Sequence, residues 1–187
     1  MQLLNSGAWW NGTSGSYYNN STTAKTVNFT NYKLSDKAKS YITTSRYYLG
    51  GYNNNPPITN EMYGYERGTL RYNTDRPLYW EGMVGLMYPS DYGYAAGNTC
   101  VTGTTLWGYD GGCYKKDWLY ISNTSQWPMS LHSGLSNRVL FVGHAGQVGN
   151  NDGYSNYALA VSPVFYLTSS TSITDGTGTS TDPYILS

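Results

Sequence analysis

Both histidines of the chain, His132 and His144, lie in one stretch that also contains Ser133 and Asp152. A histidine near a serine and a carboxylate has the composition of an acyl-transfer site, where the imidazole takes the hydroxyl proton. Such a serine needs a positioned base and a strained turn such as G-x-S-x-G, and the chain has no such run. The residues therefore predict no enzyme, and a surface or interface histidine is the simpler interpretation.

Oxygen-bearing side chains that could ligate a cation are grouped at Asn150, Asn151 and Asp152, and again at Asp175 and Asp182. Calcium needs roughly six to eight oxygens that converge on it. Both groups lie among glycine and serine, where Asn and Asp are common because their side chains bond to the backbone of turns. We therefore expect turns there, with no bound metal and no cofactor.

The two cysteines, Cys100 and Cys113, belong to no C-x-x-C motif and to no Cys/His cluster. In an exported protein they would form one disulfide that closes a short loop and contributes about 3 kcal/mol. The alternative is a pair of free buried thiols.

A different kind of pattern occurs in the run RVLFVGHAGQVG, Arg138 to Gly149. Successive side chains of a strand point to opposite faces. One side of the predicted strand pair is uniformly apolar: Val139, Phe141, Val142, Ala145 and Val148. The other side shares no size, charge or polarity, and we interpret it as a display surface for a ligand.

The predicted ligand-facing patch comprises Leu135, Arg138, Leu140, Gly143, His144, Gln147, Gly149, Asn150, Asn151, Tyr154, Tyr157, Leu159 and Ser162. Within it Arg138 is either a forked hydrogen-bond donor or a solubilising surface charge. Leu140 is either part of an apolar centre or a core residue. Tyr154 and Tyr157 suit binding, and stacking on a neighbouring strand is equally physical.

The elements that would hold this patch can be placed from caps and periodicity. A helix is predicted over residues 34–51, with Ser35 as N-cap and Gly50 as the glycine after its end. A short buried strand is predicted over residues 83–87, then a brief helix capped by Ser90. An irregular loop at residues 53–57, short strands from Trp127 to Leu167 and a terminal hairpin complete the pattern. We therefore predict an α+β class, with one or two helices packed against short antiparallel sheets.

The amino-acid composition limits the classes of partner that we expect this protein to bind. The 187 residues carry no formal net charge and only 12% are charged, so a nucleic-acid surface is not expected. The 21 tyrosines and 22 glycines suit an adaptable binding surface or an extracellular β-rich domain. We found no internal repeat and no apolar run of membrane-spanning length, so we expect one domain over residues 1–187 without membrane insertion.

Several motifs together resemble the C-type-lectin-fold domains of bacterial surface and pilin-like proteins, including variable proteins of diversity-generating retroelements. They are QLLNSGAWWN at 2–11, YERG at 65–68, the run from Arg76 to YPSDYGYA at 88–95, the cysteine pair, DWLY at 117–120, the 127–137 segment, and P-x-F-Y-L with GTGTSTDPY near the end. The likeness covers nearly the whole chain. Ser162 stands where such domains usually carry Arg.

The resemblance implies a C-type lectin fold, an extracellular or cell-surface location and a protein or other cell-surface ligand. It also implies a variable segment over residues 127–167. In retroelement systems, adenine-directed copying scatters AAY asparagine codons, from which Arg, Leu, Gly and His are reachable and Gln147 is not. The tripeptides of a sugar-binding calcium site in C-type lectins, Glu/Gln-Pro-Asn/Asp and Trp-Asn-Asp, do not occur.

Two other functions remain open at this point. The chain could be the structural head of a type IV pilin-like subunit, or an enzyme of the formylglycine-generating type, which shares the fold class and needs two reactive cysteines. Trp80, Trp107, Trp118 and Trp127 are assigned to packing, so that Trp80→Ala or Trp118→Ala would damage folding.

Overall fold

The computed structural model describes residues 15–18, 24–27, 35–152, 159–179 and 181–187. Its helices are short, as expected for the α+β class. They are α2 (Asp36–Ser40), α3 (Thr59–Glu66), α4 (Pro89–Ala95), α5 (Asn98–Gly103) and the 3-10 helices η2 (Leu106–Gly111) and η3 (Cys113–Lys116).

The strands are equally short and form several small sheets. They are β1 (Gly15–Tyr18), β2 (Ala24–Val27), β3 (Ile42–Thr43), β4 (Ser45–Tyr48), β5 (Gly51–Tyr52), β6 (Tyr79–Gly82), β7 (Gly85–Leu86), β8 (Gln126–Trp127), β9 (Leu131–His132), β10 (Arg138–Val142), β11 (Val148–Asp152), β12 (Ala160–Val161), β13 (Pro163–Val164), β14 (Tyr166–Leu167), β15 (Ile173–Asp175) and β16 (Ile185–Leu186). The largest sheet has the order β12-β8-β10-β9-β5, with β11 paired to β10. The mixed helix-and-strand class is thus confirmed. The described residues form four α-helices instead of one or two, and the sheet is not purely antiparallel, because β5 pairs with β9 and β12 pairs with β8 in parallel.

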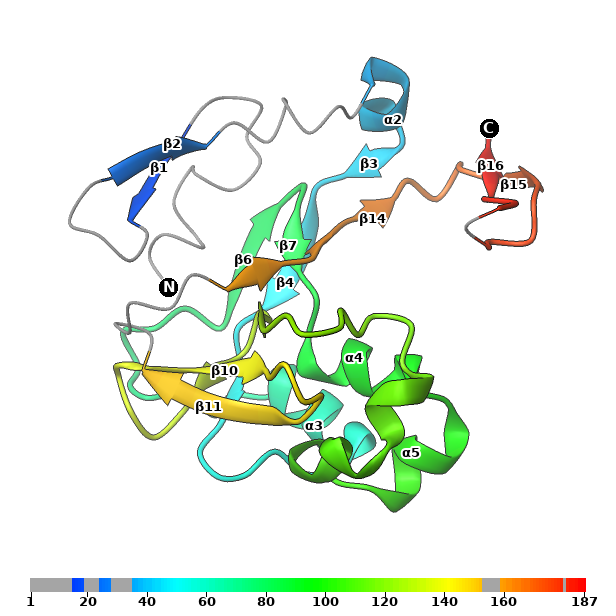
Figure 1. The fold of residues 1–187 in the computed structure, drawn as a ribbon. Helices are drawn as coiled ribbons and strands as arrows, with labels where there is room; N and C mark the ends of the chain where they lie inside the picture. The colour runs from blue at the N-terminus through cyan, green and yellow to red at the C-terminus, as the bar shows by residue number, and fades with distance from the viewer. Residues whose placement is uncertain (1–14, 19–23, 28–34, 153–158, 180) are drawn as a thin grey trace.

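Two clusters of buried side chains organise the molecule. The first joins α4, α5 and η2 to the β10–β11 hairpin through Met87, Tyr92, Leu106, Leu140 and neighbouring residues. In Figure 1 the elements that supply this cluster, among them α4, α5, β10 and β11, lie in the lower half of the molecule. The second cluster lies under β4, β6 and β7 and includes Tyr47, Leu86 and Tyr88. Half-buried Val164 packs against both clusters and so links them.

A buried carboxyl group ties α3 to α4. Glu66, the last residue of α3, is fully buried and accepts hydrogen bonds from the Ser90 backbone N–H (2.9 Å) and from the Ser90 hydroxyl. Arg67 donates to its Oε2 at 3.1 Å. Burial raises the pKa of Glu66 to about 8, and this outweighs the lowering by the Ser90 bonds and by Arg67. The YPSDYGYA helix is therefore positioned by the YERG segment.

The predicted helix over residues 34–51 is wrong beyond its first turns. Ser35 does cap it, accepting from the Ala38 N–H at 3.1 Å, and α2 ends at Ser40. The chain then forms β3 and β4, because β-branched Ile42 and Thr43 pair with β14 and Ser45 to Tyr48 pair with β6. Gly50 terminates no helix; it lies so close to the Tyr65 carbonyl oxygen that a Cβ at this position would clash with it.

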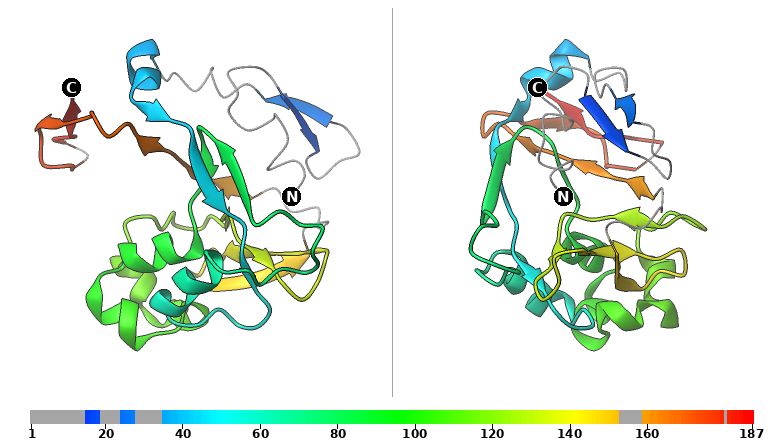
Figure 2. Two further views of the ribbon diagram at one scale, coloured as in Figure 1. Left: turned by 180° about the vertical axis from the view of Figure 1, so that it is seen from behind. Right: turned by 90° about the vertical axis from the view of Figure 1, so that its left-hand side faces the viewer.

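The structure contains two other predicted elements, the helix after Leu86 and the terminal hairpin. The helix after the Leu86 strand is α4, although its N-cap is Tyr88, whose N–H bonds to the Asp91 carboxylate at 2.8 Å, and not Ser90. The terminal strand, turn and strand are present as β15 and β16, which lie away from α3, α4 and α5 in Figures 1 and 2. The sequence analysis did not predict helix α3. Met62 is its only strongly apolar buried residue, so the sequence shows no apolar stripe at helical spacing there.

Candidate functional site

The β10–β11 hairpin is the element on which most of the predicted patch lies. Its register pairs Leu140 with Asn150 and Val142 with Val148, so these residues share one face. Leu140, Val142 and Val148 are all fully buried in the first cluster. The prediction had the two faces reversed at Leu140, because Val139 and Phe141 are equally apolar and periodicity alone could not choose between them.

Tyrosine side chains hold the turn of this hairpin. Gly143 and Gln147 close it with an N–H···O bond of 2.7 Å, and Gly146 occupies a left-handed conformation at φ 94°. The buried Tyr92 hydroxyl donates to the Gly146 carbonyl at 2.9 Å, and the Tyr120 hydroxyl donates to the His144 carbonyl. The turn is therefore fixed to the body, while the His144 and Ala145 side chains are exposed.

The opposite face of the hairpin carries a partly exposed apolar strip. Val139 and Phe141 are half-buried there, and Gly149 is paired with Phe141. The absence of a side chain at Gly149 leaves room for the Phe141 ring, because a Cβ would lie 2.8 Å from that ring and 3.4 Å from the Trp107 indole. Trp107, from η2, is 47% exposed at this edge. We call Trp107, Val139 and Phe141 the hairpin strip.

Charged groups gather at the end of the hairpin away from the turn. Arg138 donates to Asn150 Oδ1 at 3.0 Å, and Arg76 donates to the Ser136 carbonyl at 2.7 Å. Both guanidinium groups act on His132, which is buried. Burial first, then the charges of Arg138 and Arg76, lower the pKa of His132 and favour the neutral imidazole.

The predicted patch is therefore not one continuous surface. Arg138 begins β10 and His144 lies in the turn beyond its end, which at about 3.3 Å per residue separates them by roughly 20 Å. Gln147 is half-buried against Gly143 rather than beside Arg138. Arg138, His144 and Gln147 do not form the single group that the prediction required.

The remaining predicted residues divide by exposure. Leu135 is 41% exposed, while Leu140, Gly143 and Gly149 are buried and cannot offer side-chain contacts to a ligand. Leu159 is half-buried, and Ser162 donates to buried Gln126 at 2.6 Å, so its hydroxyl is engaged internally. Asn151 is placed only as a backbone partner of Val139, and Tyr154 and Tyr157 lie outside the described residues.

The side chains that were considered for catalysis or metal binding are buried or already bonded within the protein. His132 Nδ1 accepts from the Gly134 N–H at 3.1 Å, and Ser133 is buried. Among the described residues no group of three or more His, Cys, Asp or Glu side chains could hold a metal ion. The predicted Cys100–Cys113 disulfide is confirmed and engages both thiols. Within the described ranges, none of the helices has the length and hydropathy that a membrane span requires.

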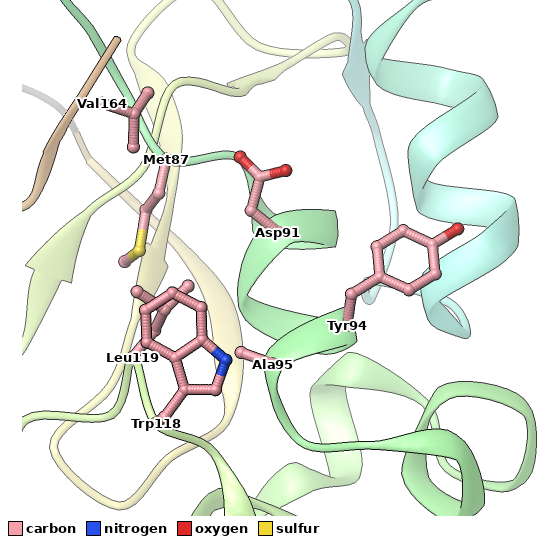
Figure 3. Close-up of a pocket in the computed structure, with 7 residues that line it drawn as sticks. All are labelled: Met87, Asp91, Tyr94, Ala95, Trp118, Leu119 and Val164. Atoms are coloured by element: carbon pink, nitrogen blue, oxygen red, sulfur yellow. The ribbon is translucent and has the colours of Figure 1, made fainter. Parts of the chain in front are cut away.

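The prediction missed a hollow beside Trp118. This indole was assigned to packing, yet it is 78% exposed, whereas Trp80 and Trp127 pack on the second cluster as expected. Trp118 lines an open hollow of about 410 Å³ between α4 and β13. Figure 3 shows its lining residues, namely Met87, Asp91, Tyr94, Ala95, Trp118, Leu119 and Val164. The only feature of the sequence that could have indicated this hollow is the acidic residue directly before a tryptophan in DWLY, residues 117–120.

Comparisons with family models, curated proteins and solved structures gave no match to this chain.

Proposed function

We propose that the chain is a ligand-binding module of the receptor or adhesin type, which recognises a protein or another cell-surface ligand through the β10–β11 hairpin. The observation that carries the proposal is that the two faces of this hairpin differ, one being buried and the other partly exposed. One face is anchored in the core by Leu140, Val142 and Val148, and the turn is held by Tyr92 and Tyr120. A surface held this firmly loses little conformational entropy when it binds.

The surface that remains for contact differs from the predicted patch. It consists of the hairpin strip, with exposed Leu135 at one end and exposed His144 at the other. Arg138 shares the Leu140 face of β10, where it bonds to Asn150, and is not part of this surface. Half-exposed aromatic side chains beside a polar rim are typical of binding hot spots.

The scaffold that we propose is a C-type lectin fold, and the motif resemblance supports it, as does the agreement on an α+β class. A disulfide is compatible with an extracellular location, because such cross-links persist in oxidising compartments. By the same resemblance we propose a diversity-generating retroelement variable protein. The neighbouring DNA tests this: a reverse-transcriptase gene and a near-repeat of codons 127–167 that differs at adenines should be present.

A display experiment tests the binding role directly. One library randomises Leu135, Val139, Phe141 and His144, and a matched library randomises Leu140, Val142 and Val148. Both are sorted for folded protein and then for binding to a panel of cell-surface proteins. The first library should stay mostly folded and yield specific binders, while the second should lose folding. Equal loss of folding in both, or no binders from folded members of the first, would refute the proposal.

A further inference from the structure

We infer that the hollow beside Trp118 is a second binding site, which takes the basic side chain of a lysine or arginine from a protein partner. This hollow lies between α4 and the segment that follows η3, and none of its lining residues belongs to the β10–β11 hairpin. It is therefore separate from the surface proposed above.

The indole of Trp118 is held out by its own neighbours. Asp117 is buried and its Oδ1 accepts from the Leu119 N–H at 2.8 Å, so the backbone on either side of Trp118 is fixed. The Leu119 carbonyl accepts from the buried Gln126 amide at 3.2 Å. An aromatic ring exposed on so rigid a turn is a prepared contact surface, since binding needs no reordering of the chain.

Apolar and anionic surfaces meet in this hollow. Met87, Leu119 and Val164 supply apolar wall, and Asp91 lines the hollow from α4. Figure 3 shows that the Asp91 carboxylate is directed away from the Trp118 indole, so the ring and the charge lie at different ends of the hollow. One carboxylate oxygen accepts from the Tyr88 N–H at 2.8 Å. The Tyr94 ring points away from Trp118, so one aromatic face is offered rather than a closed cage. Such a site matches an aliphatic stem that ends in a cation, because the stem covers the indole and the apolar wall while the head reaches the carboxylate at the other end.

The charge of Asp91 favours a cation over a neutral head group. Burial raises the pKa of Asp91, which indicates a carboxylate that has lost part of its hydration and gains from a counter-charge. Arg67 is the cation that acts on it within the structure, yet its guanidinium bonds to Glu66 at 3.1 Å and stacks on Tyr63 at 3.6 Å. Arg67 is thus committed to Glu66 and is not a lining residue of the hollow.

Indole N–H resonances of ¹⁵N-tryptophan-labelled protein provide the test. Titration with N-acetyl-lysine methylamide, or with its arginine counterpart, should shift the Trp118 signal saturably and leave the Trp107 signal unchanged. The Nε-acetylated lysine compound has the same stem without the charge and should bind about tenfold more weakly. Equal binding of the neutral compound, an equal shift at Trp107, or no saturable shift would overturn the inference.

Two variants separate the contributions of ring and charge. Asp91→Asn keeps an oxygen that can accept from the Tyr88 N–H, so α4 stays capped, and it should weaken binding about fivefold. Trp118→Leu, followed through the Leu119 amide resonance, should abolish binding. Undiminished binding to either folded variant would show that the hollow does not recognise a cation in this way.

Discussion

Asp117 and Trp118 are adjacent in the chain and have opposite environments. Asp117 is 6% exposed, while Trp118 is 78% exposed, although the usual preferences of an aspartate and a tryptophan are the reverse. The cause is local: the Asp117 side chain caps the turn by accepting from the Leu119 N–H, which directs the next side chain outward. We therefore expect Trp118→Ala to leave stability nearly unchanged, contrary to the packing assignment.

Asp117 should make folding stability depend on pH. Burial raises the pKa of Asp117 to about 7, against an ordinary value of 3.8, so the folded state binds the proton more tightly than the unfolded state. Its contribution is fully present below pH 3.8 and is lost as pH rises through 7. Denaturant unfolding between pH 4 and 8 should show a flatter pH dependence for Asp117→Asn than for the wild type.

The control is Asp36→Asn, which changes a fully exposed carboxylate on α2. This variant should keep the wild-type pH dependence. An Asp117→Asn curve with the wild-type slope would mean that Asp117 is ionised in the folded protein and that its burial has been compensated.

At the scale of elements, the β10–β11 hairpin shows what decides a strand's orientation. The run RVLFV contains apolar residues at consecutive positions, so either set of alternating residues could face the core. Leu140 and Val142 face the core because they pack in one buried cluster with Tyr92, Leu106 and Tyr109. These packing partners come from α4 and η2, far away in the sequence.

Substitutions in this hairpin should follow the observed faces. Leu140→Ala removes a fully buried side chain and should cost about 3 kcal/mol of unfolding free energy. Leu135→Ala, a matched change at a 41% exposed position, should cost less than about 0.5 kcal/mol. Equilibrium urea unfolding measures both; similar costs would contradict the assignment of Leu140 to the core.

The disulfide joins α5 to η3 and should stabilise both. Cys100 and Cys113 are separated by 13 positions, so the bond removes about 3 kcal/mol of chain entropy from the unfolded state. Cys100→Ser with Cys113→Ser should lower the unfolding free energy by about this amount. Thermal unfolding with and without reductant should show a shift in the wild type and none in the double variant.

At the scale of the whole molecule, both buried clusters end before the C-terminal strands. Among the residues that the structure describes, none after Val164 belongs to either cluster, and Ile173, Tyr184 and Ile185 are each more than half exposed. The β15–β16 hairpin is held mainly by its own turn, where the Asp182 carbonyl accepts from the backbone N–H groups of Thr177, Gly178 and Thr179. Its contact with the body includes the Tyr41 hydroxyl, which donates to the Leu186 carbonyl at 3.3 Å.

Removal of residues 172–187 should therefore change the stability of the body by less than about 1 kcal/mol. Thermal unfolding followed by near-ultraviolet circular dichroism should give a transition close to that of the full chain. A shift as large as that of Leu140→Ala would show that the terminal hairpin packs on the body in solution.

The sequence alone determined the features that depend on neighbouring residues: the α+β class, the Ser35 cap, the helix at Pro89, the terminal hairpin and the pairing of the only two cysteines. Such features require only local backbone preferences or a single partner of the right kind. Tertiary structure alone decided which face of β10 is buried, where α2 ends, and that Trp118 is exposed while Glu66 is sealed beside Ser90. These outcomes depend on packing space and hydrogen-bond partners that come from segments far apart in the chain. A short stretch of sequence therefore cannot predict them.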